Sequence, residues 1–159
     1  MELWDAYDEN MNKIGGVTLV RGEPIPDGCF HLVADVLVQH ADGSYLLMQR
    51  DLRKTRGGLW EASAGGSALQ GEKPQECAVR ELFEESGIRP QEMTELGRVL
   101  HRRNRTLYVE YLCRTDAPKD SIVLQDGETV AYKWVSGGEL HRTDNLASYR
   151  ILNFIAELT

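Results

Sequence analysis

Cysteine is scarce in this sequence, and its cysteines form no recognisable metal or redox motif. The three cysteines, Cys29, Cys77 and Cys113, are odd in number and lack the Cys-x-x-Cys spacing. This pattern favours neither a zinc site nor a disulfide framework. We interpret the cysteines as small buried side chains in a reducing cytosol.

Long apolar runs, linkers and internal repeats are also missing. No run approaches the roughly 20 apolar residues that a membrane helix requires. The opening residues, MELWDAYDEN, are too acidic and polar for a signal peptide. We therefore expect one domain over residues 1–159, located in the cytoplasm and without a membrane partner.

Positive charge is the third shortage. The chain carries 18 lysines and arginines against 25 aspartates and glutamates, which gives a net charge of −7 at pH 7. A protein that neutralises nucleic-acid phosphates needs a basic surface, so we expect no stable nucleic-acid partner. The surplus of carboxylates fits a protein that holds a cation.

Turn signals and hydrophobic patterns predict a mixture of hairpins and helices. We expect an N-terminal hairpin extension over residues 1–22, built from Leu3–Tyr7 and Gly16–Val20. Further strands are predicted from branched and aromatic residues at His31–Gln39, Tyr45–Arg50, Leu59–Ala64, Glu95–His101, Leu107–Arg114 and Thr129–Val135. A glycine-rich loop is expected after Ala64.

Two helices complete the predicted elements. Lys73–Ser86 is the stronger prediction, since Pro74 suits the first turn and Gly87 follows as a stop. Asn145–Leu158 has the apolar spacing of an amphipathic helix. Strands mixed with helices indicate an α/β (α+β) fold in which helices cover the faces of a mixed sheet.

The predicted Lys73–Ser86 helix carries a stripe of acidic side chains. Glu81, Glu84 and Glu85 are spaced i, i+3, i+4, which places them on one helical face. We expect a different face, formed by Ala78, Val79, Leu82 and Phe83, to pack on the sheet and the acidic face to point away from the core. Such a stripe is either a solvated surface or a site for a hard divalent cation such as Mg²⁺ or Mn²⁺.

The residues around this stripe favour the metal site. The run GSALQGEKPQECAVRELFEESGI, residues 66–88, contains Gly66, five residues, Glu72, seven residues, and then REL-x-EE-x-GI. This resembles the Nudix box at every defined position. The resemblance implies a Nudix-type α/β/α sandwich, with a mixed β-sheet between helices and residues 66–88 as a loop followed by a helix.

The resemblance also implies roles for particular residues. Glu81, Glu84 and Glu85 would hold the metal ions and take part in catalysis, with Glu84 or Glu81 as the base. A carbonyl group of the Gly65–Gly66 pair would be a further ligand. Glu72 and Arg80 are placed to form a supporting ion pair.

Candidates outside the box are weaker. We favour Glu128 over Glu110 as a carboxylate added from a later loop. Substrate contacts are expected from basic side chains that pair with phosphate oxygens and from an aromatic ring that could stack on a base; the candidates are Arg50 first, then Lys54, Arg103 and Trp60. Solvated charge and core packing remain alternatives for these residues.

The resemblance implies metal-dependent hydrolysis of a diphosphate bond in a nucleoside diphosphate linked to another group. Nucleotide sugars, ADP-ribose and nucleoside triphosphates all remain open as substrates. A homodimer is expected by the same analogy, with Trp4 and the N-terminal hairpin as candidate contacts.

Two other functions are weighed against hydrolysis. The segments WDAYDEN and GLWEASAGGSALQGE resemble the branch that includes isopentenyl diphosphate isomerase. Gly65-Gly66-Ser67 occupies the stretch where that enzyme has its cysteine and histidine, which argues against isomerisation. A non-catalytic nucleotide-binding module would usually have lost box glutamates, and here all of them are present.

Overall fold

Strand pairing divides residues 1–155, the part of the chain described by this computed structural model, into a two-stranded sheet and a seven-stranded sheet. The strands are β1 (Leu3–Tyr7), β2 (Lys13–Val20), β3 (His31–His40), β4 (Tyr45–Arg50), β5 (Trp60–Glu61), β6 (Ser63–Ser67), β7 (Glu92–His101), β8 (Thr106–Thr115) and β9 (Thr129–Val135). The helices are α1 (Pro74–Ser86), α2 (Gly137–Arg142) and the 3₁₀ helix η1 (Arg150–Phe154).

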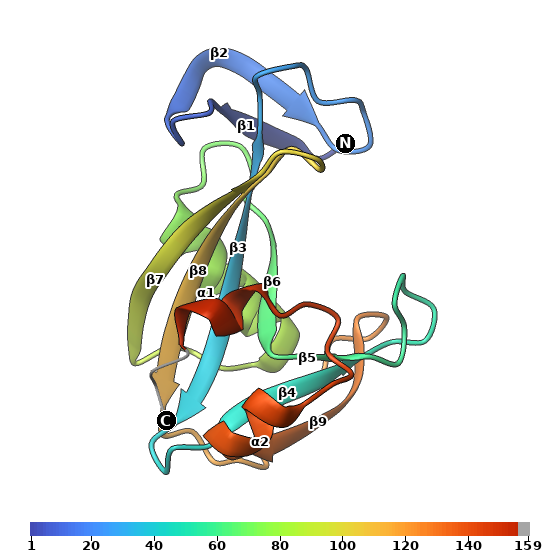
Figure 1. Ribbon diagram of the computed structural model, residues 1–159, viewed down its shortest axis with the longest axis vertical. Helices are drawn as coiled ribbons and strands as arrows, with labels where there is room; N and C mark the ends of the chain where they lie inside the picture. Colours follow the sequence, from blue (N-terminus) through green and yellow to red (C-terminus); the bar gives the residue numbers. More distant parts are fainter. Residues whose placement is uncertain (156–159) are drawn as a thin grey trace.

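The predicted N-terminal hairpin is present. β1 and β2 pair in antiparallel register from Leu3 opposite Val20, although β2 already starts at Lys13 rather than at Gly16. Figure 1 shows this hairpin beyond one end of the large sheet. A small apolar cluster that includes Trp4 and Leu19 supports it.

β3 is the central strand, and its alternating side chains serve the two faces of the sheet. Ala34, Val36 and Val38 belong to the apolar cluster that includes α1 residues, whereas Leu37 packs in the cluster with Ile151 of η1. β3 pairs parallel with β8 and antiparallel with β4 and β6, so the sheet is mixed. Figure 1 shows α1 behind these strands and η1 in front of them. The expected mixed sheet between helices is confirmed.

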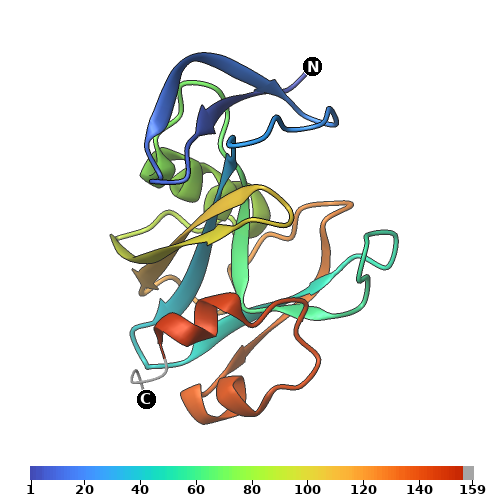
Figure 2. The same cartoon turned by 45° about the horizontal axis from the view of Figure 1, so that its top comes forward.

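The large sheet divides at β3. β4 pairs with β3 only at Gln39 opposite Tyr45, and then continues along β5 and β9. β6 takes over the same edge of β3, from Val33 opposite Ser67 to Leu37 opposite Ser63. The two halves therefore diverge, as Figure 2 shows from a second direction.

The Leu59–Ala64 strand prediction needs correction, because this region forms two short strands, β5 and β6. Gly65 and Gly66 lie inside β6 and not in a loop. A Cβ atom on Gly65 would lie 2.3 Å from the backbone oxygen of Ala34. Glycine is needed here because the β6 backbone approaches β3 closely, rather than because the chain turns.

The helical prediction for Asn145–Leu158 is wrong within the described residues, where only Arg150–Phe154 forms a helix, of 3₁₀ type; residues 156–158 lie outside them. The reason is a competing backbone pairing. The amide of Trp60 donates to the carbonyl of Asn145, and the amide of Ala147 donates back to the carbonyl of Trp60. The segment thus runs beside β5 before it turns into η1.

The helix α2 was not predicted, although its start is encoded locally. The Ser136 side chain accepts a hydrogen bond from the amide of Glu139, as an N-cap residue does. The Ser-x-x-Glu spacing is the signal that could have revealed it. No helix within residues 1–155 is long and apolar enough to cross a membrane.

The α1 boundaries agree with the prediction, since Lys73 is the N-cap and Gly87 ends the helix with a left-handed φ of 76°. Its orientation differs. Val79 and Phe83 are 36% and 42% exposed. The sheet-facing side is rotated toward Cys77, Ala78, Leu82, Glu85 and Ser86, which are buried. The prediction that the whole acidic stripe points away from the core is therefore wrong for Glu85, whose side chain is buried.

We expect Gly65→Ala to lower the free energy of unfolding by about 1–3 kcal/mol, because the added methyl group collides with backbone atoms that cannot move independently. Gly15→Ala is the matched control, since a Cβ atom there meets nothing within 4 Å, and its effect should stay within about 0.5 kcal/mol. Urea denaturation measures both values. Equal effects of the two substitutions would contradict the close approach of β6 to β3.

Candidate metal and diphosphate site

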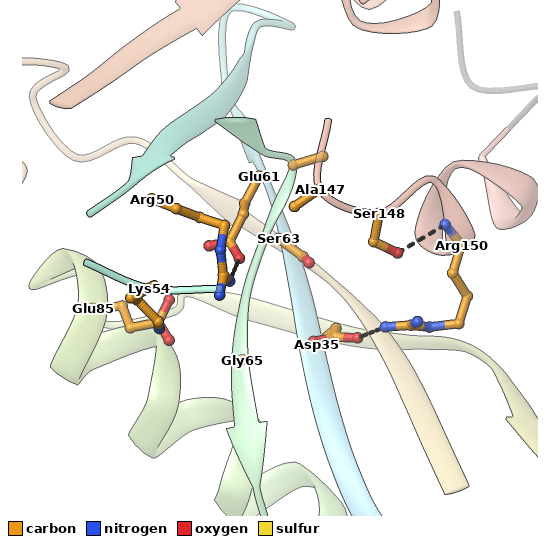
Figure 3. A pocket seen from close by; sticks show the side chains of 11 residues that line it. Asp35, Arg50, Lys54, Glu61, Ser63, Gly65, Glu85, Ala147, Ser148 and Arg150 are labelled. Carbon is orange, nitrogen blue, oxygen red and sulfur yellow. Dashed lines mark hydrogen bonds and ion pairs between the residues drawn. The ribbon is translucent and has the colours of Figure 1, made fainter. Parts of the chain in front are cut away.

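A cavity of about 130 Å³ lies where the two halves of the sheet diverge. Its charged lining residues, within the described part of the chain, are Asp35, Arg50, Lys54, Glu61, Glu85 and Arg150. Figure 3 shows that they come from β3, β4 and the loop after it, β5, α1 and η1. We call this cavity the inner hollow. Acidic and basic side chains share its wall, which suits a ligand made of a cation and an anion.

Two of the three box glutamates lie toward β6. Glu85 is buried and lines the inner hollow. Burial, followed by the neighbouring carboxylates of Glu61 and Glu81, raises the pKa of Glu85 well above its usual value. A Cβ atom on Gly66 would lie 2.5 Å from Glu81 Oε1, so this glycine makes room for the Glu81 carboxylate. Glu84 is the most exposed of the three, at the edge of the cluster.

Arg80 organises the box. Its Nε donates to Glu72 Oε2 at 2.7 Å and its Nη2 to Glu72 Oε1 at 2.9 Å, which is the predicted supporting ion pair. Nη2 also donates to the carbonyl of Ser67. Nη1 lies 2.8 Å from Glu81 Oε1 and 3.3 Å from Glu84 Oε2. Arg80 therefore also offsets the negative charge of two glutamates of the acidic stripe, Glu81 and Glu84.

The two predicted phosphate-binding cations of this region lie in the inner hollow, each paired with an acid. Arg50 forms an ion pair with Glu61 and donates to the carbonyl of Thr55. Lys54 forms an ion pair with Glu128. Glu128 is thereby held next to the hollow without being one of its lining residues. Each of the two cations is thus paired with a neighbouring carboxylate.

Among residues 1–155, no group of three histidine, cysteine or acidic side chains is already gathered as a cage for a metal ion. The ion pairs explain this arrangement, since Arg80, Arg50 and Lys54 each hold one or more of the carboxylates. The donor set nevertheless fits a hard dication, because Glu81, Glu84 and Glu85 supply carboxylate oxygens. Burial is the main cause of the raised pKa of Glu85, and the neighbouring Glu61 and Glu81 carboxylates raise it further; a bound cation would oppose both effects.

A buried ion-pair cluster forms the opposite wall, and sequence reasoning missed it. Asp35 of β3 and Glu110 of β8 are direct neighbours in the parallel ladder. Arg150 of η1 donates from Nη2 to Asp35 and from Nε to Glu110. Its guanidinium carbon lies 3.3 Å from the centre of the Tyr108 ring. The cluster ties the C-terminal segment across the open side of the sheet.

The signal for this cluster was a charge inside each of two apolar strands, HLVADVLVQ and LYVEYL. Glu110 is fully buried and accepts a hydrogen bond from Arg150, whereas the choice of Glu128 as an added carboxylate stays a prediction. Glu61 is a further functional candidate that the sequence did not reveal.

The structure does not bring two of the predicted substrate contacts to the inner hollow. Trp60 packs against the apolar cluster on the η1 side of the sheet, and Lys133 lies 4.3 Å over its ring. Arg103 is exposed in the turn between β7 and β8. Core packing and solvation, the alternatives considered for these side chains, describe their positions here.

Solved structures share this architecture. DR0079 from Deinococcus radiodurans has a TM-score of 0.75 at 16% identity, and the match covers 98% of both chains. The NUDIX domain of Shewanella oneidensis NrtR, complexed with ADP ribose, has a TM-score of 0.65 at 20% identity, covering 82% of this chain and 89% of that one. The fold and the glutamate-bearing helix place the protein among proteins of the Nudix fold.

The sequence itself gives the family. Residues 30–154 match the NUDIX domain, and the chain belongs to the Nudix family. It is 42% identical over 91 residues to an uncharacterized Nudix hydrolase of Listeria monocytogenes, covering 55% of this chain and 52% of that protein. It is 33% identical over 102 residues to the isopentenyl-diphosphate Delta-isomerase of Streptomyces coelicolor, covering 61% and 49%. The chain spans about half the length of these curated relatives.

We expect Arg150→Met to lower the free energy of unfolding by about 3–5 kcal/mol, because the buried Asp35 carboxylate would lose its counter-charge and the buried Glu110 side chain would lose its hydrogen-bond donor. Arg103→Met, the same change at an exposed turn, should cost less than about 0.5 kcal/mol. Urea denaturation of both variants gives the comparison. A loss below 1 kcal/mol for Arg150→Met would show that the cluster does not hold the C-terminal segment.

The cluster also predicts a pH dependence. Burial, followed by the neighbouring Asp35 carboxylate, raises the pKa of Glu110 from 4.5 to about 8. Between these values the folded protein keeps a proton that the unfolded chain has lost, so stability should fall as the pH rises through this window. Glu110→Gln should make the slope of unfolding free energy against pH shallower. An unchanged slope would contradict the buried, protonated state of Glu110.

Proposed function

We propose that this chain hydrolyses a diphosphate bond in a nucleoside diphosphate linked to another group, with Mg²⁺ or Mn²⁺ as cofactor. One observation carries the proposal. The buried Glu85 carboxylate shares a partly enclosed hollow with Glu61, close to Glu81, and Arg50 and Lys54 line the same wall. A dication and a diphosphate together would match this distribution of charge.

The proposed metal ligands are Glu81, Glu84 and Glu85, with a carbonyl of Gly65 or Gly66. Glu128 would join them once Lys54 releases it. A bound dication would neutralise the diphosphate and make water more acidic. Either Glu81 or Glu84 would accept the proton of the attacking water, since both belong to the acidic cluster.

The basic side chains would hold the substrate. Arg50 and Lys54 would exchange Glu61 and Glu128 for phosphate oxygens, with which arginine pairs particularly well. Arg80 would remain bound to Glu72, keeping the end of β6 against α1, so that the glutamates stay in place while the charges exchange. This division of roles places the diphosphate between the α1 carboxylates and the loop after β4.

The substrate class stays open between nucleotide sugars, ADP-ribose and nucleoside triphosphates. The ADP ribose in the Shewanella oneidensis complex supports a nucleoside diphosphate linked to a sugar. A homodimer, a cytoplasmic location and the single-domain organisation stay predictions. No stable nucleic-acid partner is proposed.

Isomerisation of isopentenyl diphosphate is the second candidate, and the likeness to the Streptomyces coelicolor enzyme favours it. In this chain, Gly65-Gly66-Ser67 occupies the stretch where the isomerase has its cysteine, so no thiol is present at that position. Cys77 does not line the inner hollow. It is buried, and desolvation raises the pKa of its thiol to about 12, so the thiol stays protonated at neutral pH. We therefore place hydrolysis first.

The test is a hydrolysis screen over diphosphate compounds, comparing Mg²⁺ with EDTA. Turnover of the best substrate should require the metal, and Glu85→Gln should lower kcat by about 100-fold or more. Glu92→Gln, the same change at the exposed start of β7, is the matched control and should be active.

Three outcomes would contradict hydrolysis at this site. Turnover that persists in EDTA or in Glu85→Gln would place the chemistry elsewhere. Tight binding without turnover would indicate a nucleotide-binding module. Conversion of isopentenyl diphosphate to its isomer would establish the second candidate.

A further inference from the structure

A second, more open hollow of about 430 Å³ adjoins the inner hollow. The two share Arg50, Glu61, Ala147, Ser148 and Arg150 as lining residues. We call this second space the distal hollow. The lining residues that it does not share with the inner hollow are Thr55, Arg56, His101, Asn104 and Tyr108. A molecule whose diphosphate lies in the inner hollow would therefore place its next group in the distal hollow.

Most of the side chains that line the distal hollow are polar or charged. Arg56 donates to the carbonyl of Ala147, and Asn104 Nδ2 donates to the hydroxyl of Tyr108 at 3.2 Å. Tyr108 adds its ring to this wall, and the Arg150 guanidinium covers one face of that ring at 3.3 Å. The ring of His101 meets Tyr108 edge-on, with centroids 6.4 Å apart. The wall thus presents hydrogen-bond donors and acceptors, since each of its described lining side chains except Ala147 carries a polar group.

An apolar group would bind poorly against this wall. Hydrogen-bonding groups that lose water without gaining a new partner oppose binding, and a site built to hydrogen-bond its ligand strongly rejects an analogue that lacks the hydroxyl. A hydroxyl-rich group would replace the lost water contacts. The same wall therefore discriminates between two ligands that carry an identical diphosphate.

We propose that the distal hollow binds the group beyond the diphosphate, that this group is a hydroxyl-bearing sugar rather than an isoprenoid chain, and that His101 and Asn104 determine this specificity. The inference rests on the proposed function for the position of the diphosphate. It goes further because it selects nucleotide sugars from the substrate classes left open and assigns selectivity to His101, the last residue of β7, and to Asn104 in the turn that follows.

The test compares the affinities of inorganic pyrophosphate, isopentenyl diphosphate, ADP-ribose and UDP-glucose by calorimetry. Ca²⁺, another hard cation for oxygen ligands, replaces Mg²⁺ so that binding is read rather than turnover. We expect at least one of the two sugar nucleotides to bind about tenfold or more tighter than pyrophosphate and isopentenyl diphosphate. The proposal is overturned if isopentenyl diphosphate binds as tightly as both sugar nucleotides, or if neither binds more tightly than pyrophosphate.

Variants locate the preference. His101→Leu and Asn104→Leu should each weaken the preferred sugar nucleotide by about tenfold and leave pyrophosphate within about twofold. Arg103→Leu, in the same exposed turn but outside the hollow, should change neither affinity. Both test positions are exposed, and thermal melts check that the variants fold. Equal loss for all probes, or no loss for the sugar nucleotide, would overturn the assignment.

The outcome is separable from that of the hydrolysis assay. A protein that prefers sugar nucleotides through His101 and Asn104 but forms no nucleoside monophosphate and sugar phosphate from them with Mg²⁺ would retain the distal site and lose the proposed reaction. A protein that hydrolyses a diphosphate but shows no dependence on these two residues would retain the reaction and lose the distal site.

Discussion

β4 leaves β3 after a single residue pair, and the candidate site exists because of that departure. β6 continues along β3 in its place, close enough that Gly65 cannot carry a side chain without displacing backbone. The inner hollow opens between the two halves, with α1 on one side and the C-terminal segment on the other. Register and backbone approach therefore position the lining side chains of β3, β5 and α1, whereas Lys54 comes from the loop after β4.

Charge pairing is the second constraint on the inner hollow. Arginines and a lysine hold the carboxylates in and beside the inner hollow: Arg80 with Glu81, Arg50 with Glu61, Arg150 with Asp35, and Lys54 with Glu128. Removing two charges from water is costly unless each has a partner. The pairs at Arg50 and Lys54 involve the side chains proposed to bind substrate and metal, whereas the Arg150 cluster is the more deeply buried and holds the wall together.

The sequence allowed the box helix and its ion pair to be predicted because both depend on local spacing. Glu81, Glu84 and Glu85 fall on one side of any α-helix, and Arg80 lies eight positions from Glu72. Asp35 and Arg150 are 115 positions apart, and only the folded sheet brings them together. Periodicity gives the angle between Val79 and Leu82 but not which of them faces the sheet, and for that reason the exposure of Val79 and Phe83 was not foreseen.

The central claim is that the acids around Glu85 form a site for a dication, although cations of the protein now hold several of them. A crystal structure of the protein soaked with Mn²⁺, recorded at the manganese absorption edge, tests this most directly. We predict an anomalous peak within bonding distance of a Glu85 carboxylate oxygen, together with Glu81 or Glu84. Strong manganese peaks elsewhere, with none beside Glu85, would contradict the account.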